Sequence, residues 1–205
     1  MTLSINIGKV LTIPSKVILS EYSGLIADRV KIGRKLKVVL DPGNGAAAVV
    51  APQLFRNLGF KVVTINAKPD GTFPGRDPDP SAEGKEVLKE LCRLVIETGA
   101  DFGVAYDGDG DRAVFVDEKG EKVVPEKSGI IFAKDYLSRE KGKIVANVSC
   151  SMILEDELSD MGGEVARVRV GDVFITEAIK NQKALFGMEI SSHFYFPDFY
   201  PFDDG

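Results

Sequence analysis

Residues 37–45, with the sequence KVVLDPGNG, open the strand–loop–helix unit that decides the fold. Their apolar run is typical of a buried strand, and the glycines that follow permit a tight turn. A helical pattern then runs to Leu58, Gly59 closes it, and residues 61–65 form a second apolar run. This strand–helix–strand order indicates a parallel sheet. The glycine loop matches neither common nucleotide-binding spacing, so we interpret it as a structural turn, with a phosphate-binding loop as the alternative.

The following segments continue the α/β alternation. Residues 68–80 form a polar, proline-rich loop in which Arg76 is the candidate for binding an anion. A solvated surface excursion is the alternative interpretation of this loop. Ser81 is expected to cap a helix that ends at Gly99, and residues 102–106 form the third strand.

The third strand delivers the chain into residues 106–112, with the sequence YDGDGDR. Because glycines separate Asp107, Asp109 and Asp111, the loop can curl and bring the three carboxylates together. A divalent cation would offset their repulsion, and oxygen donors favour Mg²⁺, Ca²⁺ or Mn²⁺ over zinc. Arg112 adds a positive charge suited to a phosphate ligand. The loop follows a parallel strand, at the end where open α/β sheets place ligands; a solvated acidic turn is the alternative.

The remaining sequence predicts a hairpin, a helix and a second strand–helix series. The hairpin strands are residues 113–116 and 122–124, and the helix begins at Pro125 and reaches about Ser138. The second series has strands at 143–147, 164–170 and 185–188, with helices at 151–161 and 172–181. The two halves share one order of elements, which indicates a duplicated topology.

These patterns divide the chain into three parts. Residues 1–35 form an N-terminal arm and a lead-in helix, since residues 17–32 carry apolar side chains at helical spacing. Residues 36–138 form an α/β domain that carries the acidic loop. A charged hinge at residues 138–142 separates it from a second, truncated α/β domain at residues 139–205.

Composition excludes several classes of protein. The 205 residues are 44% hydrophobic and 28% charged, which is ordinary for a globular protein. A net charge of −5 argues against nucleic-acid binding, and we expect no membrane partner because no apolar run approaches the ~20 residues that span a bilayer. We see no signal peptide. Cys92 and Cys150 match no metal-binding spacing, so a reducing cytoplasm is the expected location.

Four motifs together resemble the α-D-phosphohexomutase superfamily, which includes phosphomannomutase, phosphoglucomutase and phosphoglucosamine mutase. They are 41-DPGNGA-46, 107-DGDGDR-112, 170-VGD-172 and 189-EISSH-193. The resemblance implies two successive three-layer α/β/α domains with mixed, mainly parallel sheets. These would be the second domain and most of the third in a four-domain enzyme. The first and fourth domains would then be partners of this chain.

The resemblance also implies roles for residues in the two loops. In the acidic loop, Asp107, Asp109 and Asp111 would bind Mg²⁺, and Arg112 would be the catalytic residue that contacts the phosphoryl group. In the second motif, Glu189, Ser191 and His193 would bind the substrate, the first two through sugar hydroxyls. A structural, hydrogen-bonding histidine is the alternative interpretation of His193. The family usually has glycine where this chain has Met188 and Ser192, so the geometry of this loop is expected to differ.

The implied reaction moves phosphate between O1 and O6 of a hexose phosphate through a phosphoserine and a bisphosphorylated sugar. The hexose would be mannose, glucose or glucosamine. The family's Ser-His-Asn-Pro motif does not occur in the 205 residues, so we expect this chain alone to be inactive and to bind Mg²⁺ weakly.

Two other functions remain open. The first is a non-enzymatic calcium-binding module, because Glu118 is the twelfth residue counted from Asp107, as in an EF-hand loop. Arg112, at the sixth position where glycine is needed, argues against it. The second is a catalytically inactive paralogue that keeps affinity for sugar phosphates.

Overall fold

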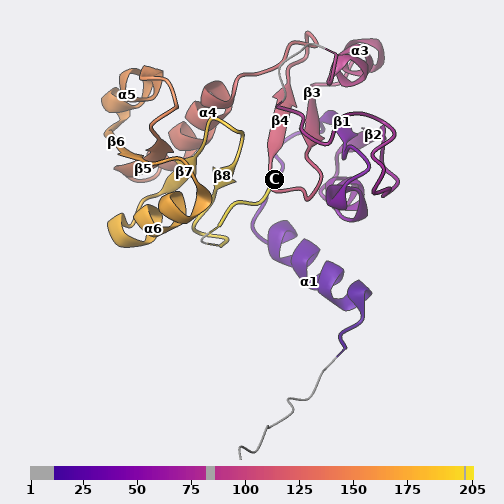
Figure 1. Ribbon diagram of the computed structural model, residues 1–205, viewed down its shortest axis with the longest axis horizontal. Helices are drawn as coiled ribbons and strands as arrows, with labels where there is room; N and C mark the ends of the chain where they lie inside the picture. The colour runs from indigo at the N-terminus through magenta and orange to yellow at the C-terminus, as the bar shows by residue number, and fades with distance from the viewer. Residues whose placement is uncertain (1–11, 82–85, 201) are drawn as a thin grey trace, which may run out of the picture.

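A computed structural model describes residues 12–81, 86–200 and 202–205. The chain forms two α/β units that lie side by side, each built on one four-stranded sheet (Figure 1). Each sheet is mixed and mainly parallel, with helices on both faces, as the sequence predicted. No helix in these ranges is long and apolar enough to cross a membrane.

The first unit is preceded by a helix that lies on its periphery. Its elements are α1 (Ser15–Ala27), β1 (Lys37–Asp41), the 3₁₀ turn η1 (Ala46–Val49), α2 (Ala51–Asn57), β2 (Lys61–Thr64), α3 (Lys89–Thr98), β3 (Phe102–Tyr106) and β4 (Ala113–Val116). The strand order is β2-β1-β3-β4, with β4 antiparallel to β3 and the other pairs parallel. None of the residues of α1 is buried.

The second unit repeats this plan. Its elements are α4 (Pro125–Leu137), β5 (Gly142–Asn147), α5 (Ile153–Leu158), the 3₁₀ turn η2 (Ser159–Met161), β6 (Gly163–Val168), α6 (Asp172–Gln182), β7 (Phe186–Met188) and β8 (Phe194–Tyr195). The order is β6-β5-β7-β8, again with only the last pair antiparallel. The two sheets therefore have the same topology, which confirms the duplication predicted from the order of elements.

Alternation along the central strands produces the three layers of the first unit. Val39 faces α3 and packs with Leu91 and Val95, whereas Val38 and Leu40 face the opposite side, which α2 covers. All five side chains are fully buried, with an exposed fraction of 0%. Such continuous burial on both faces is why the strand reads as an unbroken apolar run in the sequence.

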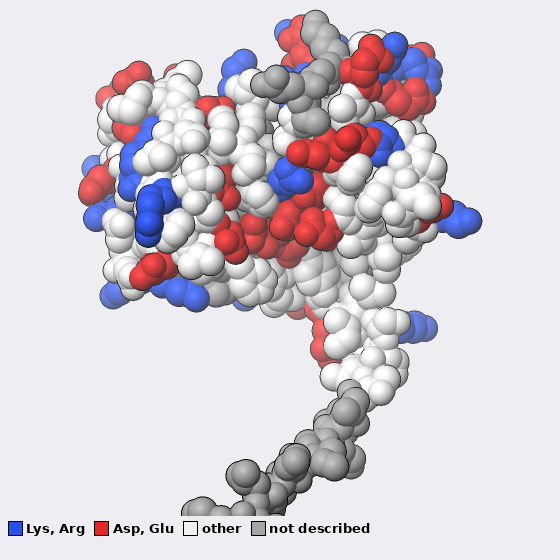
Figure 2. Space-filling view, in the orientation of Figure 1, with Lys and Arg blue, Asp and Glu red and all other residues white. Residues whose placement is uncertain are grey.

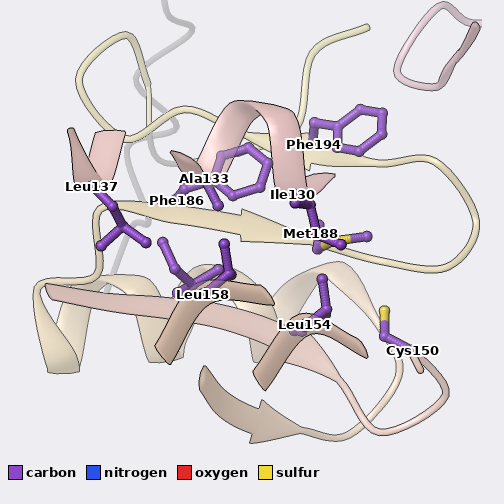
Figure 3. Close-up of a cluster of buried hydrophobic side chains, with 11 residues drawn as sticks. Ile130, Ala133, Leu137, Cys150, Leu154, Leu158, Phe186, Met188 and Phe194 are labelled. Carbon is purple, nitrogen blue, oxygen red and sulfur yellow. The ribbon is translucent and has the colours of Figure 1, made fainter. Parts of the chain in front are cut away.

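Two hydrophobic clusters sandwich the second sheet. On one face, α4 and α5 contribute Leu137, Leu154 and Leu158 to a cluster that also holds Phe186 and Met188 of β7 (Figure 3). On the other face, α6 covers the sheet through a separate cluster. Each unit therefore has its own core, and each is an α/β/α sandwich.

Helix α4 packs in the second unit, although the sequence analysis ended the first domain at residue 138. Ile130, Ala133 and Leu137 of this helix are buried in the cluster that contains Phe186 and Met188. The structure therefore moves the division between the two units to the segment before α4. The sequence showed an amphipathic helix but not which sheet its apolar face would cover.

Several element boundaries also differ from those predicted. Helix α3 begins at Lys89, and residues 82–85, which follow the proposed cap Ser81, lie outside the described part of the chain. Residues 122–124 contribute only an isolated bridge between Lys122 and Val116. Strand β6 ends at Val168, because Gly171 turns the chain into α6 at a φ of 126°.

One aromatic side chain joins the two cores. Phe115 of β4 lies 5.8 Å from Phe132 of α4 and 6.2 Å from Phe194 of β8, measured between ring centroids. Edge-on and tilted aromatic contacts at such distances are favourable. The two units therefore share an apolar contact between β4 of the first unit and α4 and β8 of the second.

Two helical glycines offer a matched test of the α4 packing. A Cβ on Gly129 of α4 would lie 2.1 Å from the sulfur of Met188, whereas one on Gly24 of α1 would meet nothing within 4 Å. Alanine favours a helix over glycine by about 1 kcal/mol, but overpacking a buried site costs about 1–3 kcal/mol. We expect Gly129→Ala to lower the melting temperature and Gly24→Ala to raise it slightly, both measured by calorimetry. Equal stabilisation by both would contradict the packing of α4 on β7.

A second test concerns acid stability. Both carboxylate oxygens of Glu155 accept from Arg167, at 2.8 and 2.6 Å, and Arg167 also donates to the carbonyl oxygens of Asn147, Cys150 and Ser151. The hydrogen bonds from Arg167 lower the pKa of Glu155, against the opposing effect of burial.

Because the folded pKa is depressed, this stabilisation is present above the unfolded pKa of about 4.3 and is lost as pH falls through the folded value. We expect Glu155→Gln to flatten the decline of melting temperature below about pH 5. Asp156→Asn, an exposed position on the same helix, is the control and should keep the wild-type slope.

Candidate functional site

The acidic loop forms the turn between β3 and β4. Oxygen atoms of Asp107, Asp109 and Asp111 all lie within 4.8 Å of one another. Gly110 has a φ of 89°, a left-handed conformation that glycine adopts without strain, and it curls the loop. The structure thus brings together the three carboxylates that the sequence singled out. Asp107 is buried, Asp111 is half-buried and Asp109 is exposed.

Asp107 holds the loop together from within. Its Oδ1 accepts hydrogen bonds from the backbone amides of Gly110 and Arg112, at 3.0 and 3.1 Å. Its Oδ2 accepts from Nε of Arg112 at 2.7 Å. Burial opposes ionisation, but these hydrogen bonds from Arg112 lower the pKa of Asp107. The carboxylate is therefore charged and fixed at the base of the loop.

Arg112 is held from two sides. Besides Asp107, its guanidinium donates to Asp79 Oδ1 at 3.0 Å and to the Ser81 hydroxyl at 3.4 Å. Its side chain is 21% exposed. Asp79 was not singled out in the sequence, because its contact with Arg112 spans 33 positions along the chain.

The glycine loop after β1 packs against the backbone of the acidic loop. The amide of Ala46 donates to the carbonyl of Gly108 at 3.0 Å. A Cβ on Gly45 would lie 2.5 Å from that same carbonyl oxygen, so only glycine permits the approach. These contacts favour the structural interpretation of the loop over a phosphate-binding one.

Arg76 is engaged inside the protein rather than presented to an anion. Its Nε donates to Asp41 Oδ2 at 2.7 Å, and the two side chains are only 5% and 2% exposed. It also donates to the backbone carbonyls of Asp41, Asp77 and Tyr106. A buried, paired guanidinium of this kind fixes the proline-rich loop against the ends of β1 and β3. The anion-binding interpretation therefore does not fit the geometry.

The second motif occupies the equivalent turn in the second unit, between β7 and β8. Backbone hydrogen bonds close it, from Glu189 N to His193 O at 3.0 Å and from Ser192 N to Glu189 O at 3.1 Å. Ser192 has a φ of 72°, which costs a non-glycine residue about 1–2 kcal/mol. Of the two positions at which the family usually has glycine, Ser192 is therefore the one where a glycine would remove backbone strain. Met188 lies in the strand and is fully buried against α4.

Glu189 is a buried anchor of this turn, with 3% of the residue exposed. Its Oε1 accepts from Asn147 Nδ2 at 3.1 Å and from the amide of Gly171 at 2.9 Å. Its Oε2 has longer contacts, 3.4 Å to His193 Nδ1 and 3.5 Å to the Tyr195 hydroxyl. The contact from His193, together with the hydrogen bonds from Gly171 and Asn147, lowers the pKa of Glu189 to about 2 despite its burial.

The two turns meet between the units. The backbones of Arg112 and His193 form an antiparallel bridge, and the amide of Ala113 donates to the carbonyl of Ser192 at 3.2 Å. Acidic side chains gather on the face between the two units, with basic side chains beside them (Figure 2). The contact brings the candidate metal ligands and the candidate sugar-binding residues into one site.

His193 lies at the centre of this contact, among three carboxylates. Its Nε2 is 3.5 Å from Asp111 Oδ1 and 3.6 Å from Asp203 Oδ2, and its Nδ1 is 2.7 Å from the Ser191 hydroxyl. Burial lowers the pKa of His193, but the contact with Glu189 and the charges of Asp111 and Asp203 raise it overall. Burial and the nearby Asp107 carboxylate raise the pKa of Asp111 to about 6.

Asp79 and Asp203 belong to this site although the sequence alone did not indicate them. Asp203 reaches it because its backbone bridges to Tyr195 and Gly205 donates to the carbonyl of Gly110 at 3.1 Å. The sequence signal was the pair of aspartates after the aromatic run at 194–202, but nothing local indicated where that run would lead.

Comparison with known proteins assigns the two α/β units to one family. Residues 20–120 match the phosphoglucomutase/phosphomannomutase alpha/beta/alpha domain II, and residues 125–205 match domain III. The chain therefore belongs to the α-D-phosphohexomutase superfamily. The division between the two matches falls before α4, as the packing of that helix indicates.

Individual relatives agree with this assignment. The chain is 40% identical over 182 residues to a probable phosphoglucosamine mutase of Methanopyrus kandleri, covering 88% of this chain and 40% of the relative. It is 43% identical over 191 residues to a phosphomannomutase/phosphoglucomutase of Pseudomonas syringae, covering 92% and 40%. A crystal structure of a phosphoglucomutase/phosphomannomutase family protein from Burkholderia thailandensis matches with a TM-score of 0.87 and 34% identity, covering 92% and 41%. The chain thus spans about 40% of the length of these relatives.

The support that Gly45 gives to the acidic loop can be tested. We expect Gly45→Ala to displace the Gly108 carbonyl and to weaken Mg²⁺ binding at least about tenfold, as loss of supporting contacts around metal ligands commonly does. Gly71→Ala is the matched control, because a Cβ there would meet nothing within 4 Å. Affinities would be measured by calorimetric titration with MgCl₂. Unchanged affinity in Gly45→Ala would show that the close approach does not shape the acidic loop.

Proposed function

We propose that the chain supplies the Mg²⁺-binding and sugar-binding loops of a phosphohexomutase that moves phosphate between O1 and O6 of a hexose phosphate. The candidate substrates are mannose, glucose and glucosamine phosphates. The observation that carries the proposal is the contact between the two turns, in which the backbones of Arg112 and His193 form an antiparallel bridge. That contact supports the proposal because it brings an oxygen-donor cluster, a guanidinium and the polar side chains of the second turn close together.

The residues of the acidic loop fit Mg²⁺. All three donors are carboxylate oxygens within 4.8 Å of one another, and hard oxygen ligands are those that Mg²⁺ prefers. The raised pKa of Asp111 reflects burial and a repulsion from Asp107 that a cation would relieve. When bound, Mg²⁺ would neutralise charge on the transferring phosphoryl group.

The chain's own residues would bind and orient the substrate. Arg112, fixed by Asp107 and Asp79, would present its guanidinium to phosphate oxygens in a set orientation. Ser191 would donate to or accept from a sugar hydroxyl. Glu189 would accept a hydroxyl hydrogen bond through Oε2, the oxygen with the longer contacts.

The calcium-binding alternative has little support in the geometry. An EF-hand loop is flanked by helices, whereas the acidic loop is flanked by the paired strands β3 and β4. The inactive paralogue remains a distinct alternative, because sugar-phosphate affinity without turnover fits the same loops.

Calorimetric titration of the purified chain tests the proposal. We expect weak Mg²⁺ binding, and binding of glucose 1,6-bisphosphate that depends on Mg²⁺. Asp109→Asn should weaken Mg²⁺ binding at least about tenfold, since it removes one donor, whereas the exposed Asp160→Asn should not. Submicromolar Ca²⁺ affinity with no response to Mg²⁺ would favour the calcium-binding module instead.

An activity measurement separates enzyme from inactive paralogue. Residues 20–205 would replace the corresponding segment of the Pseudomonas syringae relative, and conversion of glucose 1-phosphate to glucose 6-phosphate would be followed. We expect turnover by the chimera and none by the 205-residue chain alone. An inactive chimera that still binds the bisphosphate would support the paralogue, and turnover by the chain alone would contradict the need for a separate serine.

A further inference from the structure

The His193 side chain contacts the acidic loop, its own turn between β7 and β8, and Asp203 near the C-terminal end of the described residues. Through Nε2 it faces Asp111 of the acidic loop at 3.5 Å, and through Nδ1 it contacts Ser191 at 2.7 Å and Glu189 at 3.4 Å. Asp203 also approaches Nε2, at 3.6 Å. The imidazole therefore lies between a candidate metal ligand and a candidate sugar ligand.

These contacts restrict the ring on both edges. The His193 side chain is 19% exposed, and Asp203 is 13% exposed, so neither has much freedom to rotate into solvent. The backbone of His193 is also fixed, by its bridge to Arg112 and by its carbonyl, which accepts from Glu189 N. A movement of Asp111 would change its contact with the ring, and a movement of the ring would change the contact of Nδ1 with the Ser191 hydroxyl.

We propose that His193 and Asp203 are positioning residues that couple cation binding at the acidic loop to the orientation of the Ser191 hydroxyl. Asp203 holds the imidazole against Asp111, and the opposite edge of the ring orients the Ser191 hydroxyl. Cation binding at the acidic loop draws on the Asp111 carboxylate and changes its contact with Nε2. The turn between β7 and β8 then responds to cation binding through the His193 side chain. The inference rests on the proposed Mg²⁺ site and adds two residues with no direct role in binding it.

The placement of Asp203 supports this role independently. Its backbone bridges to Tyr195, and Gly205 donates to the carbonyl of Gly110 within the acidic loop. The next residue, Asp204, points elsewhere, since its carboxylate accepts from the Tyr22 hydroxyl at 2.8 Å. Adjacent aspartates thus have different partners, which provides a matched pair of variants.

Nuclear magnetic resonance of the 205-residue chain tests the coupling directly. The sequence contains one histidine, so the imidazole signals belong to His193 without further assignment. MgCl₂ would be titrated while three probes are followed: the Gly110 amide, the His193 ring and the Ser191 amide. We expect all three to shift with the same half-saturation concentration. In His193→Gln, which lacks the ring, the Gly110 response should remain and the Ser191 response should be lost.

Asp203→Asn should reduce the Mg²⁺-induced shifts of the His193 ring and Ser191, while Asp204→Asn should leave them as in the wild type. A Ser191 response that persists in His193→Gln, or a silent His193 ring beside a responding Gly110, would overturn the coupling alone. Silence at Gly110 would overturn the metal site and the coupling with it. Equal losses in Asp203→Asn and Asp204→Asn would also overturn the role of Asp203, because they would reflect general loosening of the segment.

Discussion

The crowding of carboxylates where the two units meet is the constraint on which the rest of the structure depends. Asp107 and Asp111 share the acidic loop, and Glu189 and Asp203 approach from the other unit and its following segment. Their repulsion is met by the guanidinium of Arg112, by contacts with the His193 imidazole and by hydrogen bonds from backbone amides. The pKa values divide accordingly: those of the hydrogen-bonded Asp107 and Glu189 are lowered, and that of Asp111 is raised by burial and by Asp107.

Contacts outside the carboxylate cluster hold the two turns in place. The close approach of Gly45 to the Gly108 carbonyl and the buried pair of Arg76 with Asp41 fix the first turn from below. Phe115 joins the two cores through its contacts with Phe132 and Phe194. A rigid shell of this kind suits a site in which electrostatic positioning supplies most of the catalytic effect.

The sequence predicted well what is encoded locally and poorly what depends on distant partners. The acidic loop was identifiable because glycine spacing and carboxylates are adjacent in residues 107–112, and the strands because apolar runs mark burial. The packing of α4 was not, since an amphipathic pattern indicates a buried face but not the sheet that buries it. Likewise, Arg76 invited an anion-binding interpretation because its partner Asp41 lies 35 positions away. Asp203 was missed for the same reason.

The bridge between Arg112 and His193 joins corresponding positions of the two units. Each residue immediately precedes the last, antiparallel strand of its sheet, β4 or β8. A residue that pairs with its own counterpart is the hallmark of an isologous contact, the kind that relates the subunits of a twofold dimer. The junction is thus a dimer-like interface within one polypeptide. Because the halves are covalently joined, each side can differ from the other: the first turn carries the three carboxylates of the acidic loop, and the second carries Glu189, Ser191 and His193.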